Sequence, residues 1–231
     1  MIKFWPIVPA AGVGSRMQAD RPKQYLMIQQ QYLLDHTVNT LLTYPVFQQL
    51  VLVLSANDPY WPQSRFASDE RIVRADGGSE RCHSVLNGLL ALQGQAEPQD
   101  WVVVHDVARP CLRHSDLDAL LAGLGEHGGI LAAPTRDTMK RGQLNNDGTV
   151  TIDHTVKRDQ LWHALTPQVF RYGALLQALQ QCLQQGLEVT DEASAMEQVG
   201  VAPRLIAGRA DNIKVTRPDD LALAELFLRG E

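Results

Sequence analysis

The sequence contains few cysteines and no long apolar run. Its three cysteines, Cys82, Cys111 and Cys182, are odd in number and show no CxxC spacing. This pattern argues against a disulfide framework and a zinc site and fits a reducing compartment. No stretch approaches the roughly 18 consecutive apolar residues of a membrane-spanning helix, and the apolar run at residues 4–8 is too short for the core of a signal peptide. These absences predict a cytoplasmic protein with no membrane partner.

Positive charge is also scarce. Lys and Arg number 21 against 26 Asp and Glu, so the net charge is −5. A generic nucleic-acid binder needs an excess of Lys and Arg to neutralise phosphates, so we expect no nucleic-acid partner; a nucleotide needs only a local basic pocket. Hydrophobic residues make up 45% of the 231 residues, an ordinary value for a globular protein. Because repeats and Ser/Gly/Pro-rich linkers are missing, we expect one domain over residues 1–231.

Apolar runs alternate with amphipathic stretches along most of the chain. The short runs predict strands at residues 4–8, 50–54, 71–73, 101–104, 130–133, 205–206 and 213–215. Helical spacing of apolar residues predicts helices around residues 34–42, 85–90, 117–124, 175–183, 190–200 and 218–227. Ser79 is expected to cap the second helix, and Ser115 with Asp118 to form a capping box at the third. The alternation predicts an α/β fold with a mostly parallel sheet covered by helices on both faces.

Residues 138–158 interrupt this pattern. Two polar extended segments flank Asn146-Asp147-Gly148, and Asp-Gly is a strong turn signal between paired strands. A hairpin with so little apolar content cannot offset its own ordering entropy. We therefore expect a protruding β-arm that packs on something else, such as a second subunit.

The segment that follows the first strand is rich in small residues. Ala10, Ala11, Gly12 and Gly14 let backbone N–H groups approach phosphate oxygens without obstruction. This loop also lies at the carboxyl end of a strand, where open α/β sheets bind ligands. Two cations follow it, Arg16 and Lys23, and both suit a nucleoside triphosphate.

Other interpretations of this loop differ in spacing. A dinucleotide-binding loop requires a third glycine where Met17 stands, and an acidic residue at the end of the second strand, which ends at Leu54-Ser55 instead. A P-loop requires Gly-Lys-Ser/Thr, which does not occur there. The remaining alternative is an ordinary tight turn followed by two solvated cations.

Two further segments carry polar groups at predicted functional positions. Asp106 directly follows a buried strand and suits Mg²⁺, which prefers carboxylate, phosphate and water oxygens; Asp211 is a candidate second carboxylate. The glycines of Gly77-Gly78-Ser79 precede a helix and are expected to expose amide donors that read the edge of a base. For each segment the alternative is structural: a cap, a turn or a solvated helix start.

Eight motifs that include these segments occur in order, and together they resemble the 2-C-methyl-D-erythritol 4-phosphate cytidylyltransferase family. They are PAAGVGSRM, PKQYL, GGSERCHSV, VVHDVARP, RDTMKR, LWHALTPQ, TDEAS and GRADNIKVTRP. The motifs span residues 9–218, and the likeness runs from about Pro9 to Phe227. The resemblance implies a Rossmann-like nucleotidyltransferase core and a homodimer with an exchanged β-arm. It also implies transfer of CMP from CTP to methylerythritol phosphate, with release of pyrophosphate.

The resemblance also implies roles for individual residues. Arg16 and Lys23 would stabilise charge at the α-phosphate, and residues 10–14 would cradle the triphosphate. Gly78, Ser79 and Ser84 would bind cytosine. Mg²⁺ would lie near Asp106 and Asp211. Methylerythritol phosphate would be bound by Arg109, Thr138, Lys214 and Arg158, and Arg158 would come from the arm of a partner. Two positions depart from the family pattern: Ser79 replaces a common acidic residue and Val107 a common alanine.

The implied chemistry needs no Ser, Cys or His nucleophile, because the acceptor phosphate is itself nucleophilic. Catalysis is then positioning plus electrostatic stabilisation of two anions brought together. Three alternatives stay open at this point. A ribitol-5-phosphate cytidylyltransferase shares the loop and the use of CTP, and a non-catalytic nucleotide sensor would release no pyrophosphate. A dehydrogenase is disfavoured by Met17.

Overall fold

A seven-stranded mixed sheet forms the centre of the computed structural model, which describes residues 2–12, 14, 17 and 19–230. The strand order is β11-β7-β10-β6-β1-β4-β5. These strands are β1 (Phe4–Pro9), β4 (Leu50–Leu54), β5 (Ile72–Asp76), β6 (Trp101–Val104), β7 (Gly129–Pro134), β10 (Trp162–Arg171) and β11 (Arg204–Ala207). All neighbours pair in parallel except β10, which runs antiparallel to both β6 and β7. The expected mostly parallel α/β sheet is confirmed.

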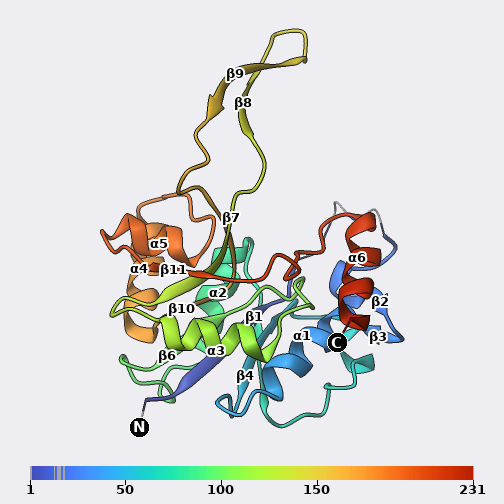
Figure 1. The fold of residues 1–231 in the computed structure, drawn as a ribbon. Coiled ribbons are helices and arrows are strands. Elements are labelled where there is room, and N and C mark those ends of the chain that lie inside the picture. The colour runs from blue at the N-terminus through green and yellow to red at the C-terminus, as the bar shows by residue number, and fades with distance from the viewer. Residues whose placement is uncertain (1, 13, 15–16, 18, 231) are drawn as a thin grey trace.

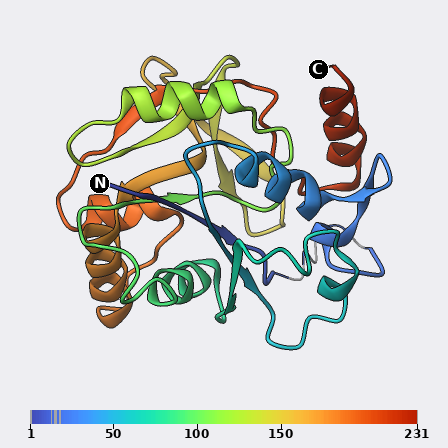
Figure 2. The same cartoon turned by 90° about the horizontal axis from the view of Figure 1, so that it is seen from below.

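Helices cover both faces of this sheet (Figure 2). One face packs against α1 (Leu33–Leu42) and α3 (His114–Gly123), and the other against α2 (Arg81–Leu90), α4 (Tyr172–Gln184) and α5 (Glu192–Gln198). In β1, Val8 belongs to the first core and Ile7 to the second, as the alternation of side chains along a strand requires. Every residue of β4 and β6 is buried, which explains why both strands are continuous apolar runs.

A smaller layer lies beside α1. Helix α6 (Pro218–Arg229) packs there against the short paired strands β2 (Met27–Ile28) and β3 (Gln31–Tyr32), around a separate apolar cluster that includes Ile28, Val215 and Ala224. The one-turn helices η2 (Lys23–Tyr25) and η3 (Trp61–Gln63) complete this side.

The predicted arm is a hairpin that projects away from the rest of the chain (Figure 1). Strands β8 (Met139–Leu144) and β9 (Val150–Val156) pair antiparallel around a turn in which Gly148 has φ +83°, a conformation that favours glycine. All of β8 is exposed. Leu144, Val150 and Ile152 are 72%, 67% and 66% exposed. Because Leu144 lies opposite Val150 and Ile152 is two residues further on, the three form one apolar face.

Several predicted boundaries are wrong. Residues 213–215 are not a strand, although the Val215 N–H donates to the Ala108 carbonyl at 2.8 Å. Strand β10 was not predicted, because Thr166, Pro167 and Gln168 interrupt its apolar pattern where its register on β7 shifts.

Two predicted helix caps are also wrong. Helix α2 begins after Glu80, and the Ser79 hydroxyl lies 3.2 Å from His83 Nδ1 instead. Helix α3 begins at His114, where Asp116 rather than Asp118 accepts a hydrogen bond from the Arg113 N–H.

Candidate active site

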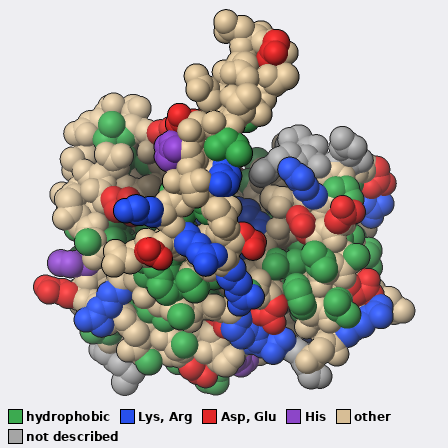
Figure 3. All heavy atoms as spheres, turned by 45° about the horizontal axis from the view of Figure 1, so that its top comes forward, with side chains coloured by type: hydrophobic (Ala, Val, Ile, Leu, Met, Phe, Trp, Pro, Cys, Tyr) green, Lys and Arg blue, Asp and Glu red, His purple; other side chains and the backbone are tan. Residues whose placement is uncertain are grey.

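A cavity of about 470 Å³ opens at the carboxyl ends of β1 and β6. In Figure 3, Lys and Arg side chains gather on this side of the molecule, at the foot of the hairpin. The cavity is lined by Pro9, Ala10, Ala11, Gly12, Gly14, Lys23, Gln24, Gly78, Ser79, Glu80, Arg81, Ser84, Asp106, Val107, Ala108 and Lys214. The structure thus brings together three segments that the sequence singled out separately: the loop after the first strand, the start of α2 and the residues after β6.

The loop after β1 packs tightly against the cation that follows it. Gly14 has φ +67°, and a Cβ there would lie 2.9 Å from Lys23 Cγ, so both conformation and space favour glycine. Gln24 is hydrogen-bonded to the loop, since its Nε2 donates to the Ala10 carbonyl at 2.7 Å. Lys23 Nζ donates to the Val215 carbonyl at 3.1 Å. Arg16, the other predicted cation, lies outside the described residues.

The segment before α2 is held by its own hydrogen bonds. The Gly77 N–H donates to the Leu54 carbonyl at 2.7 Å, and the Gly78 N–H donates to Ser84 Oγ at 3.1 Å. The expectation that both glycine amides are exposed donors is therefore wrong. A Cβ on Gly77 would lie 2.2 Å from the Ala11 Cβ, so glycine here lets this segment touch the loop after β1.

A cluster of charges forms the floor of the cavity around Asp106. One of its oxygens, Oδ1, accepts from Arg81 Nε at 2.9 Å, while Oδ2 lies 2.8 Å from Lys214 Nζ and 3.7 Å from Arg109 Nε. Burial by itself raises the pKa of the Asp106 carboxyl, but the charges of Arg81 and Lys214 outweigh it and hold that pKa well below its usual range. Asp106 is therefore an anion at neutral pH.

His105, the neighbour of Asp106, has a structural role. Its ring is fully buried, and burial lowers its pKa to about 4. Nδ1 lies 3.0 Å from Thr166 Oγ1, and Nε2 lies 3.1 Å from the Arg109 carbonyl. The Arg109 carbonyl can only accept, so the neutral ring donates from Nε2 and its Nδ1 accepts from the Thr166 hydroxyl. The Thr166 oxygen in turn accepts from the Asp106 N–H at 3.0 Å. This chain of bonds fixes the backbone of Asp106.

Four predicted residues do not line the cavity. Arg109 is buried behind it, with Nη1 donating to the Asn212 carbonyl at 2.7 Å. Thr138 and Arg158 are exposed at the foot of the hairpin, and Arg158 donates to the Arg136 carbonyl. The carboxylate of Asp211 lies 2.7 Å from Arg209 and 3.4 Å from Arg113.

The donor atoms around the cavity can be compared with the needs of Mg²⁺, which requires hard oxygen ligands. Asp106 fits, because it is an anionic carboxylate that lines the cavity. Asp211 does not fit, because it is not among the residues that line the cavity; its carboxylate pairs with Arg209 and Arg113 instead. Glu80, Cys82 and His83 place ligand atoms within 4.8 Å of one another, but a thiol and an imidazole are poor ligands for this ion.

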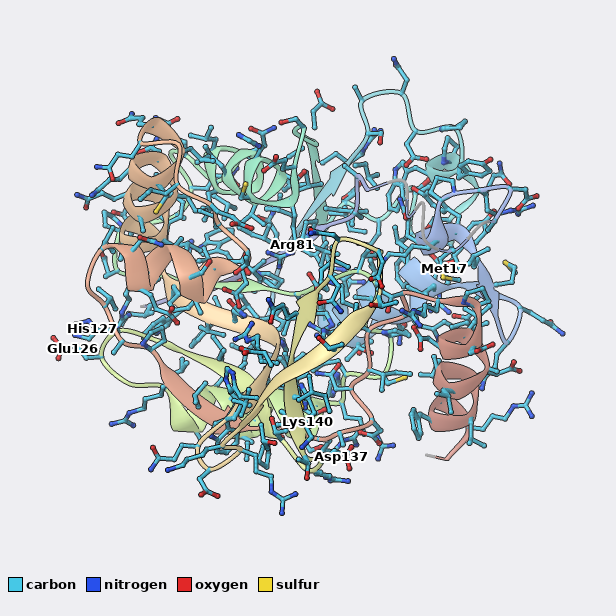
Figure 4. All side chains as sticks on the ribbon, turned by 90° about the horizontal axis from the view of Figure 1, so that it is seen from above. Met17, Arg81, Glu126, His127, Asp137 and Lys140 are labelled. Atoms are coloured by element: carbon cyan, nitrogen blue, oxygen red, sulfur yellow. The ribbon has the colours of Figure 1, made fainter. Side chains whose placement is uncertain are left out.

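Sequence reasoning gave no role to Arg81 and Glu192, although both lie inside motifs that it quoted. Figure 4 labels Arg81 near the middle of the face from which the hairpin projects. Its guanidinium lies 2.6 Å from Glu192, which is the first residue of α5. The two residues are 111 positions apart, so no local pattern points to their contact.

The family of this chain follows from its similarity to known proteins. The sequence profile of the IspD family, 2-C-methyl-D-erythritol 4-phosphate cytidylyltransferase, matches residues 5–230. This chain belongs to the IspD family. The resemblance expected from the eight motifs is thereby confirmed, and the dehydrogenase alternative is excluded.

Individual IspD relatives agree along the whole chain. A 2-C-methyl-D-erythritol 4-phosphate cytidylyltransferase of Vibrio atlanticus (strain LGP32) is 54% identical over 96% of this chain and 94% of its own. One of Pseudomonas putida (strain GB-1) is 55% identical over 94% and 92%.

Solved IspD structures share the fold. A crystal structure of 4-diphosphocytidyl-2C-methyl-D-erythritol synthase superposes with a TM-score of 0.83 at 35% identity, covering 99% of both chains. The Francisella tularensis enzyme gives 0.83 at 33% identity, over 97% of this chain and 99% of its own. Among the helices that the structure describes, none has the length and apolar character of a bilayer span.

Proposed function

We propose that this chain transfers CMP from CTP to 2-C-methyl-D-erythritol 4-phosphate, giving 4-diphosphocytidyl-2-C-methyl-D-erythritol and pyrophosphate. Family membership supports the activity. We place the activity in this cavity because a glycine-rich loop, Lys23 and Lys214 line it together. The relatives carry the methylerythritol name, and no described residue of the cavity favours the ribitol phosphate alternative.

The reaction is a substitution at the α-phosphorus of CTP. An oxygen of the acceptor phosphate forms a bond to that phosphorus, and the bond from the α-phosphorus to the bridging oxygen breaks, releasing pyrophosphate. The electron pair of the broken bond leaves with pyrophosphate, and no enzyme nucleophile is required. The difficulty is the repulsion between two anions, which preorganised positive groups reduce.

Residues of the cavity divide this task. The backbone at Ala10, Ala11, Gly12 and Gly14 cradles the triphosphate, and Lys23 stabilises the charge that develops at the α-phosphate and on pyrophosphate. Arg16 has the same role by family resemblance alone. Gly78, Ser79 and Ser84 contact cytosine. The Gly78 amide is bonded to Ser84 and the Ser79 hydroxyl lies 3.2 Å from His83 Nδ1, so cytosine would replace one of these partners.

A divalent cation is part of the proposal. Asp106 would hold Mg²⁺ bound together with CTP, and the ion would neutralise phosphate charge. Asp211 is not included, because it is not among the residues that line the cavity.

The acceptor phosphate is assigned to Lys214 in the cavity and to Thr138, Arg109 and Arg158 around it. We assign Thr138 and Arg158 from the arm of a second subunit, so that the chain works as a homodimer in the cytoplasm. The exposed apolar face of Leu144, Val150 and Ile152 supports an arm that is covered in the assembly. Residues 1–231 then form one nucleotidyltransferase domain, of which residues 138–158 are the dimerisation arm.

The test is pyrophosphate release from purified protein with CTP, Mg²⁺ and methylerythritol phosphate, run in parallel with ribitol 5-phosphate and without an acceptor. We expect release only with methylerythritol phosphate. Equal or faster release with ribitol 5-phosphate would assign the alternative substrate. CTP binding without release under any condition would support a nucleotide sensor.

A further inference from the structure

Arg81 bridges two buried carboxylates at the edge of the cavity. Its Nη1 and Nη2 donate to Glu192 Oε1 and Oε2 at 2.6 and 3.0 Å, while Nε donates to Asp106 Oδ1 at 2.9 Å. A guanidinium presents its donors in a rigid planar fork. Glu192 therefore occupies the outer edge of this fork, and only the Nε edge reaches Asp106.

Glu192 is the more deeply buried of the two carboxylates, with its side chain 1% exposed against 9% for Asp106. A carboxylate buried to this degree persists as an anion only when it is paired and hydrogen-bonded. Both of its oxygens accept from Arg81. The charges of Glu192 and Asp106 raise the pKa of Arg81 against the opposing effect of burial, so the guanidinium stays charged.

The backbone that carries Glu192 is tied to the central sheet. Gln168 on β10 is buried; its Oε1 accepts from the Ala193 N–H at 2.9 Å, and its Nε2 donates to Asp191 Oδ2 at 2.8 Å. Gln168 pairs with Val104, two residues before Asp106. Both carboxylates that hold Arg81 are thus fixed to neighbouring strands.

The charges at this point of the cavity are unequal in number. Three cations, Arg81, Arg109 and Lys214, contact two carboxylates, Asp106 and Glu192. One unit of positive charge remains, which suits an incoming phosphate. Without the Glu192 charge, the outer edge of Arg81 would lose its ionic partner, and Asp106 is the other carboxylate that the structure describes in contact with Arg81. Arg81 would then compete with Lys214 for Asp106.

We propose that Glu192 is a positioning residue for the transfer reaction: by holding the outer edge of Arg81, it leaves Asp106 Oδ2 to Lys214 and so fixes where Lys214 meets the acceptor phosphate. This inference rests on the proposed function, in which Lys214 binds that phosphate. Glu192 itself touches neither substrate, and it acts through Arg81 and Asp106.

The experiment compares steady-state kinetics of Glu192→Gln, Glu192→Asp and the matched control Glu197→Gln, which changes an exposed glutamate on the same helix. Rates are expressed per folded chain, measured by near-UV circular dichroism. Glu192→Gln should lower kcat roughly 10- to 100-fold, the scale of a misplacement of about 1 Å. It should also raise the KM for methylerythritol phosphate while leaving the KM for CTP within about twofold. Glu192→Asp, which keeps the charge, should recover part of this loss.

A double-mutant cycle with Arg81→Gln provides the second readout. If Glu192 acts through Arg81, the double variant should lose no more activity than Arg81→Gln alone. A kcat and KM for Glu192→Gln equal to those of wild type and of Glu197→Gln would overturn the inference, because Glu192 would then be purely structural. Multiplying losses in the double variant would overturn it as well.

Folding and the parent activity are controlled separately. Should Glu192→Gln fail to fold, the comparison uses Glu192→Asp, for which a kcat equal to wild type contradicts the inference and a several-fold loss with a raised acceptor KM supports it. The wild-type chain is assayed first. An inactive wild type overturns the proposed function and this inference with it, whereas an active wild type with an unaffected Glu192→Gln variant overturns the inference alone.

Discussion

The side chains on the floor of the cavity contact other residues of the same chain, whereas those of the hairpin arm are mostly exposed. Around Asp106, the charged partners that the structure describes all come from the same chain: Arg81, Lys214, Arg109 and, beyond Arg81, Glu192. Along residues 139–156 the side chains are almost all exposed, and three large apolar ones share a face. The floor of the cavity is therefore complete within one chain, whereas the proposed role of the arm in binding the acceptor phosphate depends on a second chain.

The largest expected effect concerns the cavity. Lys23→Ala should lower kcat about 10²- to 10³-fold, the scale for the loss of one preorganised group that stabilises the transition state. Steady-state pyrophosphate release measures it. Lys3→Ala, at the opposite end of β1, is the matched control and should be near normal. A near-normal kcat for Lys23→Ala would remove this lysine from the chemistry.

The next effect contrasts the two regions in stability. Leu89→Ala removes a fully buried side chain between α2 and the sheet and should lower the unfolding free energy by about 2–5 kcal/mol. Leu144→Ala removes a 72% exposed side chain on the arm. In the monomer it should change that energy by no more than about 0.5 kcal/mol. Urea unfolding at low protein concentration compares them, and equal losses would mean that the arm is packed within one chain.

Acid should weaken the floor of the cavity in a defined pH range. Burial lowers the pKa of His105 to about 4 from an ordinary value of 6.5, so the unfolded chain binds this proton more readily than the folded one. The stability contributed by neutral His105 is complete above about pH 6.5 and falls as pH drops toward 4, by roughly 3 kcal/mol in all.

Asp106, on the same floor of the cavity, does not contribute to the change in stability between pH 4 and 6.5. Asp106 has a lowered pKa, so its contribution is lost only below about 3.8, the value of an unperturbed Asp. Urea unfolding between pH 4 and 6.5 should show a slope that His105→Gln reduces. An unchanged slope in that variant would contradict the buried neutral ring.

The smallest of these effects tests the arm in the reaction. Arg158→Ala should raise the KM for methylerythritol phosphate about tenfold and leave the KM for CTP unchanged, because its assigned role is to bind the acceptor phosphate. Arg204→Ala on β11 is a suitable control. A change confined to the KM for CTP would contradict this assignment.

Features of this molecule that depend on residues close together in the sequence could be predicted. The loop at Ala10–Gly14, the cation Lys23 and the acid after β6 were predicted, because each stands at a fixed spacing from a buried strand. The hairpin was predicted from another local signal, the Asp147-Gly148 turn between two polar extended segments. Its turn and its exposure are both present in the structure.

Features that depend on distant residues were not predicted. Strand β10 has a polar interruption at Thr166 and Gln168, and its place between β6 and β7 depends on pairing across the sheet. The contact of Arg81 with Glu192 joins α2 to α5 and has no local signal. Asp211 was assigned to a metal from its motif alone, whereas neighbours brought in by the fold pair it with arginines.

The central claim is that Lys23 of one chain and Arg158 of another serve the same active site. It is tested most directly by mixing Lys23→Ala and Arg158→Ala chains after denaturation and refolding. The assay uses methylerythritol phosphate well below its KM, where the Arg158→Ala parent should be about tenfold less active than wild type. In a two-fold symmetric dimer, random pairing gives each mixed dimer one intact site, so activity should rise above both parents, to about a quarter of wild type. A mixture of Lys23→Ala with Lys214→Ala, both assigned to the same side of the site, should recover nothing. If the first mixture is no more active than its two parents, the arm does not complete the partner's site.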